Sequence, residues 1–152
     1  YEVLKPDDHF RNPAFPELND YGVYMYLEKD TGKARYVGQA FNKSSMALRR
    51  RVRWEIVKDG NGCAESVFYR KCKVDRFNLI LKVAHIKDAK ENEIAVKVDD
   101  KFMNAIERAL IFERARAGDP LMNETGKSSY RLGPIEVVNN GDFAPLPASI
   151  VL

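Results

Sequence analysis

The chain has 152 residues, of which 45% are hydrophobic and 31% are charged, and its formal net charge at pH 7 is +3. These are the values of one globular domain with room for a core. No apolar run has the length of a membrane span and the first residues do not form a signal peptide, so we expect a cytoplasmic (intracellular) protein without a membrane partner. Cys63 and Cys72 lack the flanking pattern of a zinc site and are expected to be reduced thiols.

The first part of the chain is predicted to be an irregular arm followed by a hairpin. Residues 1–20 are rich in Pro, Asp and Asn, and because the chain begins with Tyr1 rather than Met we expect a fragment of a longer one. Residues 21–28 alternate as in a strand, with Val, Met and Leu on one side and two Tyr on the other. Residues 29–33 have the composition of a turn, and residues 34–38 are the returning strand.

A helix and two strands are expected next. The helix is predicted over residues 46–58, after polar residues that suit a cap, and residues 60–62 (Gly-Asn-Gly) would end it. Its apolar positions repeat at helical spacing: Leu48, Val52 and Ile56. Residues 67–74 and 77–86 alternate enough to be strands.

The remaining elements follow a polar segment, residues 87–93, which is expected to be a loop. A short strand is predicted over residues 94–98. The next helix runs from about residue 99 to residue 118, because two aspartates at its start are good N-caps and a Gly stands at its end. The Gly- and Pro-rich segment after it contains one predicted strand, residues 135–138.

Basic residues gather at two places in the chain. The first cluster is Arg49, Arg50, Arg51 and Arg53, and the second is Arg70, Lys71, Lys73 and Arg76. A run of like charges is usually a solvated face. Phosphate contact is the alternative, because clustered basic groups displace counterions from nucleic acid.

Two tyrosines and one arginine are candidates for phosphate chemistry. Eleven residues separate Tyr24 from Tyr36, and the hairpin would bring them together. A strand tyrosine usually serves packing, and a functional phenol needs a nearby charge because its ordinary pKa is about 10. Arg51 offers a fork of donors that matches a phosphate, but the adjacent Arg49 and Arg50 leave the choice among the three open.

One glutamate and one asparagine complete the candidate set. Glu107 lies in a mostly apolar helix, where carboxylates are rarely buried unless they are paired or bind a metal. Glu113 lies on another face of the same helix and competes for that role. Asn123 follows Pro120 in a loop, where an Asn is usually a turn former.

The ordered set of these residues resembles the GIY-YIG nuclease superfamily. The two triplets Gly22-Val23-Tyr24 and Tyr36-Val37-Gly38 are similar to the pair that gives the family its name. Residues 48–52 resemble the segment with the family's arginine, residues 105–111 resemble the helix with its metal-binding glutamate, and residues 120–123 resemble its Pro-x-x-Asn.

The resemblance implies an α+β fold, a small mixed or antiparallel sheet flanked by helices. It covers residues 21–125, which would form the catalytic domain with an insertion between about 60 and 100. Residues 1–20 would be an N-terminal arm and residues 126–152 a C-terminal extension.

The resemblance also implies hydrolysis of a phosphodiester with one divalent cation, Mg²⁺ or Mn²⁺. Glu107 would hold the metal, and Tyr24 would act as, or orient, the general base. Arg51 would neutralise charge on the phosphate, and Tyr36 and Asn123 would position water, phosphate or neighbouring side chains.

One position departs from the family pattern. Glu55 stands where some family members have a histidine, one helical turn after Arg51. A second carboxylate at the site is the alternative role for that residue.

The leading functional hypothesis is therefore a metal-dependent endonuclease of restriction, homing or repair type that hydrolyses double-stranded DNA. The residues expected to contact the DNA backbone are Arg49, Arg50, Arg53, Lys43, Arg70 and Lys71. Because one such site cuts one strand, cutting both strands would require a homodimer or a second cleavage event. Sequence specificity would come from the insertion, the terminal segments or an additional DNA-recognition domain. The alternatives are a non-catalytic nucleic-acid-binding domain on a nuclease scaffold and a protein-interaction domain.

Overall fold

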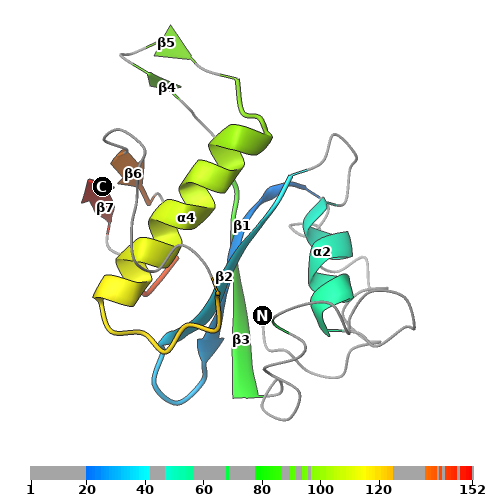
Figure 1. Ribbon diagram of the computed structural model, residues 1–152, viewed down its shortest axis with the longest axis vertical. Helices are drawn as coiled ribbons and strands as arrows, with labels where there is room; N and C mark the ends of the chain where they lie inside the picture. The colour runs from blue at the N-terminus through cyan, green and yellow to red at the C-terminus, as the bar shows by residue number, and fades with distance from the viewer. Residues whose placement is uncertain are drawn as a thin grey trace.

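A three-stranded antiparallel sheet with a helix on each face forms the centre of the protein (Figure 1). The computed structural model describes residues 20–41, 47–56, 68, 78–86, 90–91, 94–95, 97–124, 136–139, 141, 143–146 and 148–151. The expected α+β class, a small antiparallel sheet flanked by helices, is confirmed for this part of the chain.

The strand order in the sheet is β2-β1-β3, with both neighbours antiparallel to β1. β1 spans Gly22–Glu28, β2 spans Ala34–Ala40 and β3 spans Leu79–Ala84. The first two strands form the predicted hairpin, and β3 lies inside the predicted strand 77–86. Because β1 is central, six of its seven residues are buried.

The turn between β1 and β2 follows from its sequence. Gly32 adopts a φ of 67°, which side chains disfavour and glycine accepts. Its backbone N–H donates to the carbonyl of Glu28 at 2.9 Å, and the Glu28 N–H donates to the Lys33 carbonyl at 2.9 Å. The Asp-Thr-Gly composition of the loop therefore predicts the turn correctly.

The two helices cover opposite faces of the sheet. α2 spans Ala47–Ile56 and α4 spans Asp100–Arg116 (Figure 1). The side chain of Asp99 caps α4 by accepting from the N–H of Phe102 at 2.8 Å, as the paired aspartates predict. Among the described residues, no helix has both the length and the apolar character needed to cross a membrane.

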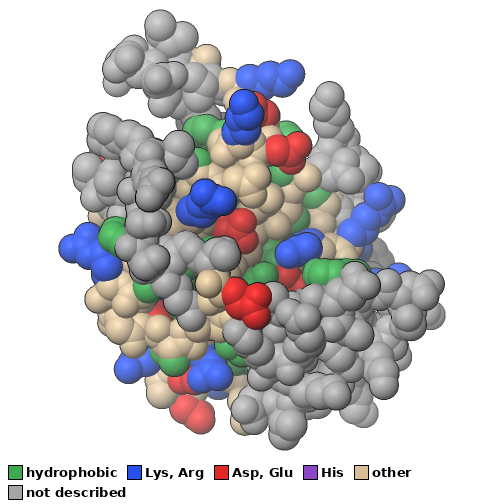
Figure 2. Space-filling model, in the orientation of Figure 1, with side chains coloured by type: hydrophobic (Ala, Val, Ile, Leu, Met, Phe, Trp, Pro, Cys, Tyr) green, Lys and Arg blue, Asp and Glu red, His purple; other side chains and the backbone are tan. Residues whose placement is uncertain are grey.

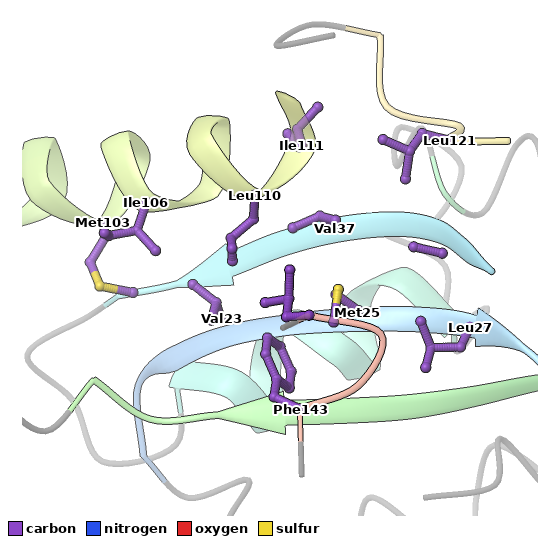
Figure 3. Packing of buried hydrophobic residues seen from close by; sticks show 12 residues of the cluster. Val23, Met25, Leu27, Val37, Met103, Ile106, Leu110, Ile111, Leu121 and Phe143 are labelled. Atoms are coloured by element: carbon purple, nitrogen blue, oxygen red, sulfur yellow. The ribbon is translucent and has the colours of Figure 1, made fainter. Parts of the chain in front are cut away.

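Each face of the sheet has its own core, as the alternation along β1 predicts. On the α2 side Tyr24 and Tyr26 pack with residues of α2 and with Phe68. On the other side, α4 and the C-terminal segment cover the sheet (Figure 3). The residues of this second core that Figure 3 labels are Val23, Met25, Leu27, Val37, Met103, Ile106, Leu110, Ile111, Leu121 and Phe143.

Two small ribbons complete the described structure and include corrections. β4, Lys90–Glu91, pairs with β5, Ile94–Ala95, so the segment 87–93 that was expected to be a loop contains a short strand. β6, Glu136–Val138, confirms the predicted strand and pairs with β7, Ser149–Val151, which was not predicted. Such short strands depend on a pairing partner, which periodicity cannot supply.

The strand predicted over residues 67–74 is wrong at Phe68, whose backbone is helical. The other residues of that segment lie outside the described residues. The Phe68 ring stacks on Tyr26 with 4.1 Å between the ring centroids, and only 1% of Phe68 is exposed. Burial of one aromatic ring against the sheet therefore decides the placement of this residue, where strand propensity does not.

The glycines of the two triplets allow close approach. A Cβ at Gly38 would overlap the end of the Tyr24 side chain, and Tyr24 lies directly opposite Gly38 in the β1–β2 register. A Cβ at Gly22 would overlap the carbonyl oxygen of Ala84 in β3. The second triplet thus ends in glycine because the phenol of the first triplet occupies that space.

Replacing Gly38 by Ala is expected to lower the free energy of unfolding by about 1–3 kcal/mol, because the buried Tyr24 ring must move. Urea denaturation measures the change. Gly141→Ala is the matched control, since a Cβ there meets no atom within 4 Å. Equal stability of the two variants would contradict the close approach of Tyr24 to β2.

Candidate active site

Three tyrosines gather on the face of the sheet that α2 covers. Tyr24 and Tyr26 point to the same face because they are two residues apart in β1, and Tyr36 lies opposite Tyr26 in β2. Their ring centroids are 5.8–6.4 Å apart. Tyr24 and Tyr26 are fully buried, whereas 7% of Tyr36 is exposed. The expected meeting of Tyr24 and Tyr36 is observed, and Tyr26 is an unpredicted third member.

α2 lies over these rings and contributes a buried carboxylate. Glu55 is fully buried, and its Oε1 accepts a hydrogen bond of 2.6 Å from the hydroxyl of Tyr24. The hydroxyl of Tyr26 donates to Oε2 at 3.4 Å. Burial raises the pKa of Glu55 to about 7, while the nearby Arg51 and the two phenol hydrogen bonds oppose that rise.

Arg51 connects to the same group through its Nε. This atom donates to Glu55 Oε1 at 3.1 Å and to the oxygen of Tyr24 at 3.3 Å. The guanidinium carbon lies 4.9 Å from the centroid of the Trp54 ring, so the indole packs against it. The side chain is still 40% exposed. Of the adjacent arginines, it is therefore Arg51 that joins the tyrosines and also faces solvent.

The remaining basic candidates are less informative. Arg50 and Arg53 are exposed on α2, and Arg49 is half-buried. Lys43, Arg70 and Lys71 lie outside the described residues. On the face seen in Figure 2, the Lys and Arg side chains of the described residues are scattered, with Asp and Glu among them.

Glu107 lies on α4, which covers the other face of the sheet, and its charge acts on Arg51 and on Tyr36. One turn earlier, Asn104 accepts a hydrogen bond of 3.3 Å from Gln39 at the end of β2, which ties α4 to this edge strand. Burial raises the pKa of Glu107 to about 7, and the positive charges of Arg51 and Arg108 oppose the rise. The Glu107 carboxylate is thus close enough to Arg51 for their charges to interact.

The tyrosine hydroxyls have little tendency to ionise. Burial raises the pKa of Tyr24 well above its ordinary value, and the charge of Glu55 raises it further. Burial and Glu55 also raise the pKa of Tyr36, with a smaller contribution from Glu107, while Arg51 opposes the rise. The charges of Glu55, Glu107 and Arg51 therefore all act on Tyr36, the least buried of the three phenols.

Asn123 binds the backbone of the second triplet. Its Oδ1 accepts from the N–H of Val37 at 3.0 Å, and its Nδ2 donates to the Val37 carbonyl at 2.7 Å. Only 6% of Asn123 is exposed. The N–H of Met122 also donates to the carbonyl of Arg35 at 2.6 Å. The amide therefore replaces a neighbouring strand at the outer edge of β2, and its observed contacts fix the strand that carries Tyr36.

The carboxylates available for a cation are few. Within the described residues, no three His, Cys, Asp or Glu side chains lie together as a metal cage. Glu107 is partly exposed and offers one carboxylate, which suits Mg²⁺, a cation that keeps several waters and binds through one or two carboxylates and a substrate phosphate. Glu55 instead uses both oxygens on Tyr24, Tyr26 and Arg51.

Comparisons with protein-family models, curated proteins and solved structures find no match to this chain. A function for the chain must therefore be derived from these side chains. Tyr26 is a member of this group that the sequence does not single out, whereas Glu55 stands at an expected position, with a second carboxylate as its alternative role. Tyr26 follows Tyr24 by two residues on one strand, and Glu55 follows Arg51 by four on one helix.

The buried carboxylate of Glu55 makes stability depend on pH. Its folded-state pKa of about 7 lies above the ordinary value of 4.5, so its neutral form stabilises the fold fully below pH 4.5. That contribution is lost as the pH rises through 7. The free energy of unfolding of the parent chain should therefore fall relative to that of Glu55→Gln as the pH is raised from 5 to 8, by an amount on the order of 3 kcal/mol.

Urea denaturation at both pH values measures this difference, with Glu113→Gln as the control variant. A stability difference between Glu55→Gln and the parent that is the same at pH 5 and pH 8 would exclude a raised pKa at Glu55.

Proposed function

We propose that the chain is a metal-dependent endonuclease domain of the GIY-YIG type, which hydrolyses phosphodiester bonds of DNA with Mg²⁺ or Mn²⁺. One observation carries the proposal. Tyr24, Arg51 and Glu107 are far apart in the sequence, yet Arg51 hydrogen-bonds Tyr24, the rings of Tyr24 and Tyr36 lie 6.4 Å apart, and the charge of Glu107 acts on both Arg51 and Tyr36. A cation ligand and a phosphate-binding arginine stabilise the charge that develops on a phosphodiester in the transition state, and a phenol beside them can orient the attacking water.

The less buried members of the group would contact the substrate. Glu107 would hold the cation, and the cation would supply charge stabilisation for the phosphate and the leaving oxygen. The guanidinium of Arg51, which is 40% exposed, would bind the non-bridging oxygens of the phosphate. Tyr36 would orient the attacking water, because it is the least buried of the three phenols and lies among the charges of Arg51, Glu55 and Glu107.

Tyr24 receives a different role from the one first expected. Its hydroxyl is fully buried and donates its proton to Glu55, so it is poorly placed to accept a proton from water. In the proposed mechanism Tyr24 instead helps to orient Arg51, because its hydroxyl oxygen accepts the 3.3 Å hydrogen bond from Arg51 Nε. Asn123 supports Tyr36 through the backbone of β2.

The substrate is proposed to be double-stranded DNA. Arg49, Arg50 and Arg53 lie on α2 close to Arg51 in sequence and would contact the phosphate backbone, which makes binding sensitive to salt. A homodimer or an additional DNA-recognition domain would supply double-strand cleavage and specificity. A restriction, homing or repair role fits the same chemistry.

Cleavage of supercoiled plasmid tests the proposal. With Mg²⁺ or Mn²⁺ the parent chain should convert the plasmid to nicked and linear forms, and excess chelator should stop the reaction. Salt-dependent DNA binding without cleavage would replace the proposal with a non-catalytic nucleic-acid-binding domain. If the chain neither cleaved nor bound DNA, that result would indicate a protein-interaction domain instead.

A further inference from the structure

Glu55 is the most deeply buried charged group of the site. Its side chain is fully buried, and its oxygens face three donors: the hydroxyls of Tyr24 and Tyr26 and the Nε of Arg51. Its position, four residues after Arg51 on α2, places both side chains over the same tyrosines. The Glu55 carboxylate is therefore enclosed by these side chains and does not face the surface.

Neither a metal-binding role nor a stabilising role accounts for Glu55. Both carboxylate oxygens already accept hydrogen bonds, so neither is presented to a cation. Burial of a carboxylate carries a large desolvation penalty, and a well-packed apolar residue in place of a buried ion pair is often as stable or more stable. Because the buried carboxylate of Glu55 lowers the stability of the fold, its presence at the centre of the site is more readily explained by the side chains that it orients.

Arg51 is the group that Glu55 holds. Two contacts restrict the guanidinium: Glu55 Oε1 binds Nε at 3.1 Å, and the Trp54 ring lies against the guanidinium carbon at 4.9 Å. The guanidinium is planar, so fixing Nε and one face also fixes the direction of the two Nη groups. The Tyr24 oxygen, 2.6 Å from Glu55 and 3.3 Å from Nε, completes a triangle of hydrogen bonds.

We propose that Glu55 is a positioning residue, which locks Tyr24 and Arg51 into one hydrogen-bonded unit so that the Nη groups of Arg51 face the non-bridging oxygens of a phosphodiester in a single orientation. This inference rests on the proposed nuclease function. It assigns Glu55 no contact with substrate, cation or attacking water. Small errors in the placement of such a group reduce the rate by about 100-fold.

A double-mutant cycle tests the action of Glu55 through Arg51. At pH 8, Glu55→Gln should lower kcat for plasmid cleavage about 10–100-fold with little change in KM, since other backbone contacts bind the DNA. Glu55→Gln added to Arg51→Lys should cause little further loss. Glu113→Gln on α4 is the charge-removal control and should leave kcat unchanged. Additive losses, or full activity of Glu55→Gln, would overturn the inference.

A second measurement separates failure of this inference from failure of the proposed function. In the ¹H–¹⁵N spectrum of the parent chain, the Arg51 Nε–H should exchange slowly with water, because it is bound to Glu55 and Tyr24. In Glu55→Gln its exchange should accelerate at least about tenfold. If Glu55→Gln does not fold, Glu55→Asp replaces it with the same expectation, because the shorter side chain withdraws the carboxylate from Nε. Fast exchange in the parent chain refutes the positioning role, whether or not the chain cleaves DNA.

Discussion

Glu107→Gln is expected to abolish metal-dependent DNA cleavage, with a loss of roughly 10³-fold or more in single-turnover rate. Glutamine keeps the size of the side chain but removes the negative charge that would hold the cation. A bound cation contributes several kcal/mol of charge stabilisation in the transition state, which corresponds to that factor. Titration calorimetry with Mn²⁺ should show a parallel loss of metal binding, whereas DNA binding without metal should remain.

The matched control is Glu113→Gln, six residues later on the same helix and on a different face. It should cleave like the parent chain. If Glu107→Gln cleaved at the parental rate, the metal would have to be held elsewhere and the assignment of Glu107 would be wrong.

The same carboxylate predicts a pH dependence. Glu107 has a pKa raised to about 7 by burial, and it must be ionised to bind a cation. Below that pKa the ionised fraction, and with it the rate at low metal concentration, should rise about tenfold per pH unit and then level off. Saturating metal should shift the curve to lower pH, because the cation favours the ionised carboxylate.

Asp119→Ala is expected to lower the free energy of unfolding by about 3–5 kcal/mol, since it leaves a buried guanidinium without its partner. Arg114 Nε donates to Asp119 Oδ2 at 2.7 Å, and the two side chains are 10% and 3% exposed. The same oxygen accepts from the N–H of Ala34 at 3.1 Å, and Arg114 also donates to the carbonyl of Pro145. The pair thus joins α4, β2 and the C-terminal segment.

Urea denaturation at pH 7 measures this loss as a shift of the midpoint. The control is Asp100→Ala, an exposed aspartate in the first turn of α4, which should lose less than about 1 kcal/mol. A double variant, Arg114→Met with Asp119→Leu, should recover most of the stability because neither charge is then left unpaired. Equal losses in Asp119→Ala and Asp100→Ala would show that the pair is solvated.

The parts of the fold that the sequence predicts are those decided by neighbours in the chain. The alternation along β1, the turn at Gly32 and the cap at Asp99 are local, and all three predictions are confirmed. The helical backbone of Phe68 and the short strand β4 depend on partners distant in sequence or on pairing, and both were missed.

The site shows the same division. The contact of Arg51 with Tyr24 is foreseen from an ordered set of residues. The buried state of Glu55 is not, because an exposed and a buried glutamate have the same helical spacing. Similarly, Asn123 has the sequence context of a turn, and only the position of β2 beside it reveals the two hydrogen bonds to Val37. Nuclease activity, the cation and the DNA partner stay predictions.

The segment that carries Asn123 also limits how two copies of the chain can associate. Asp119, Met122 and Asn123 satisfy backbone groups along the outer edge of β2, at Ala34, Arg35 and Val37. A strand from a second molecule therefore finds this edge already occupied, so a continuous sheet cannot form across it. If double-strand cleavage uses a dimer, its two-fold axis must pass through some other surface.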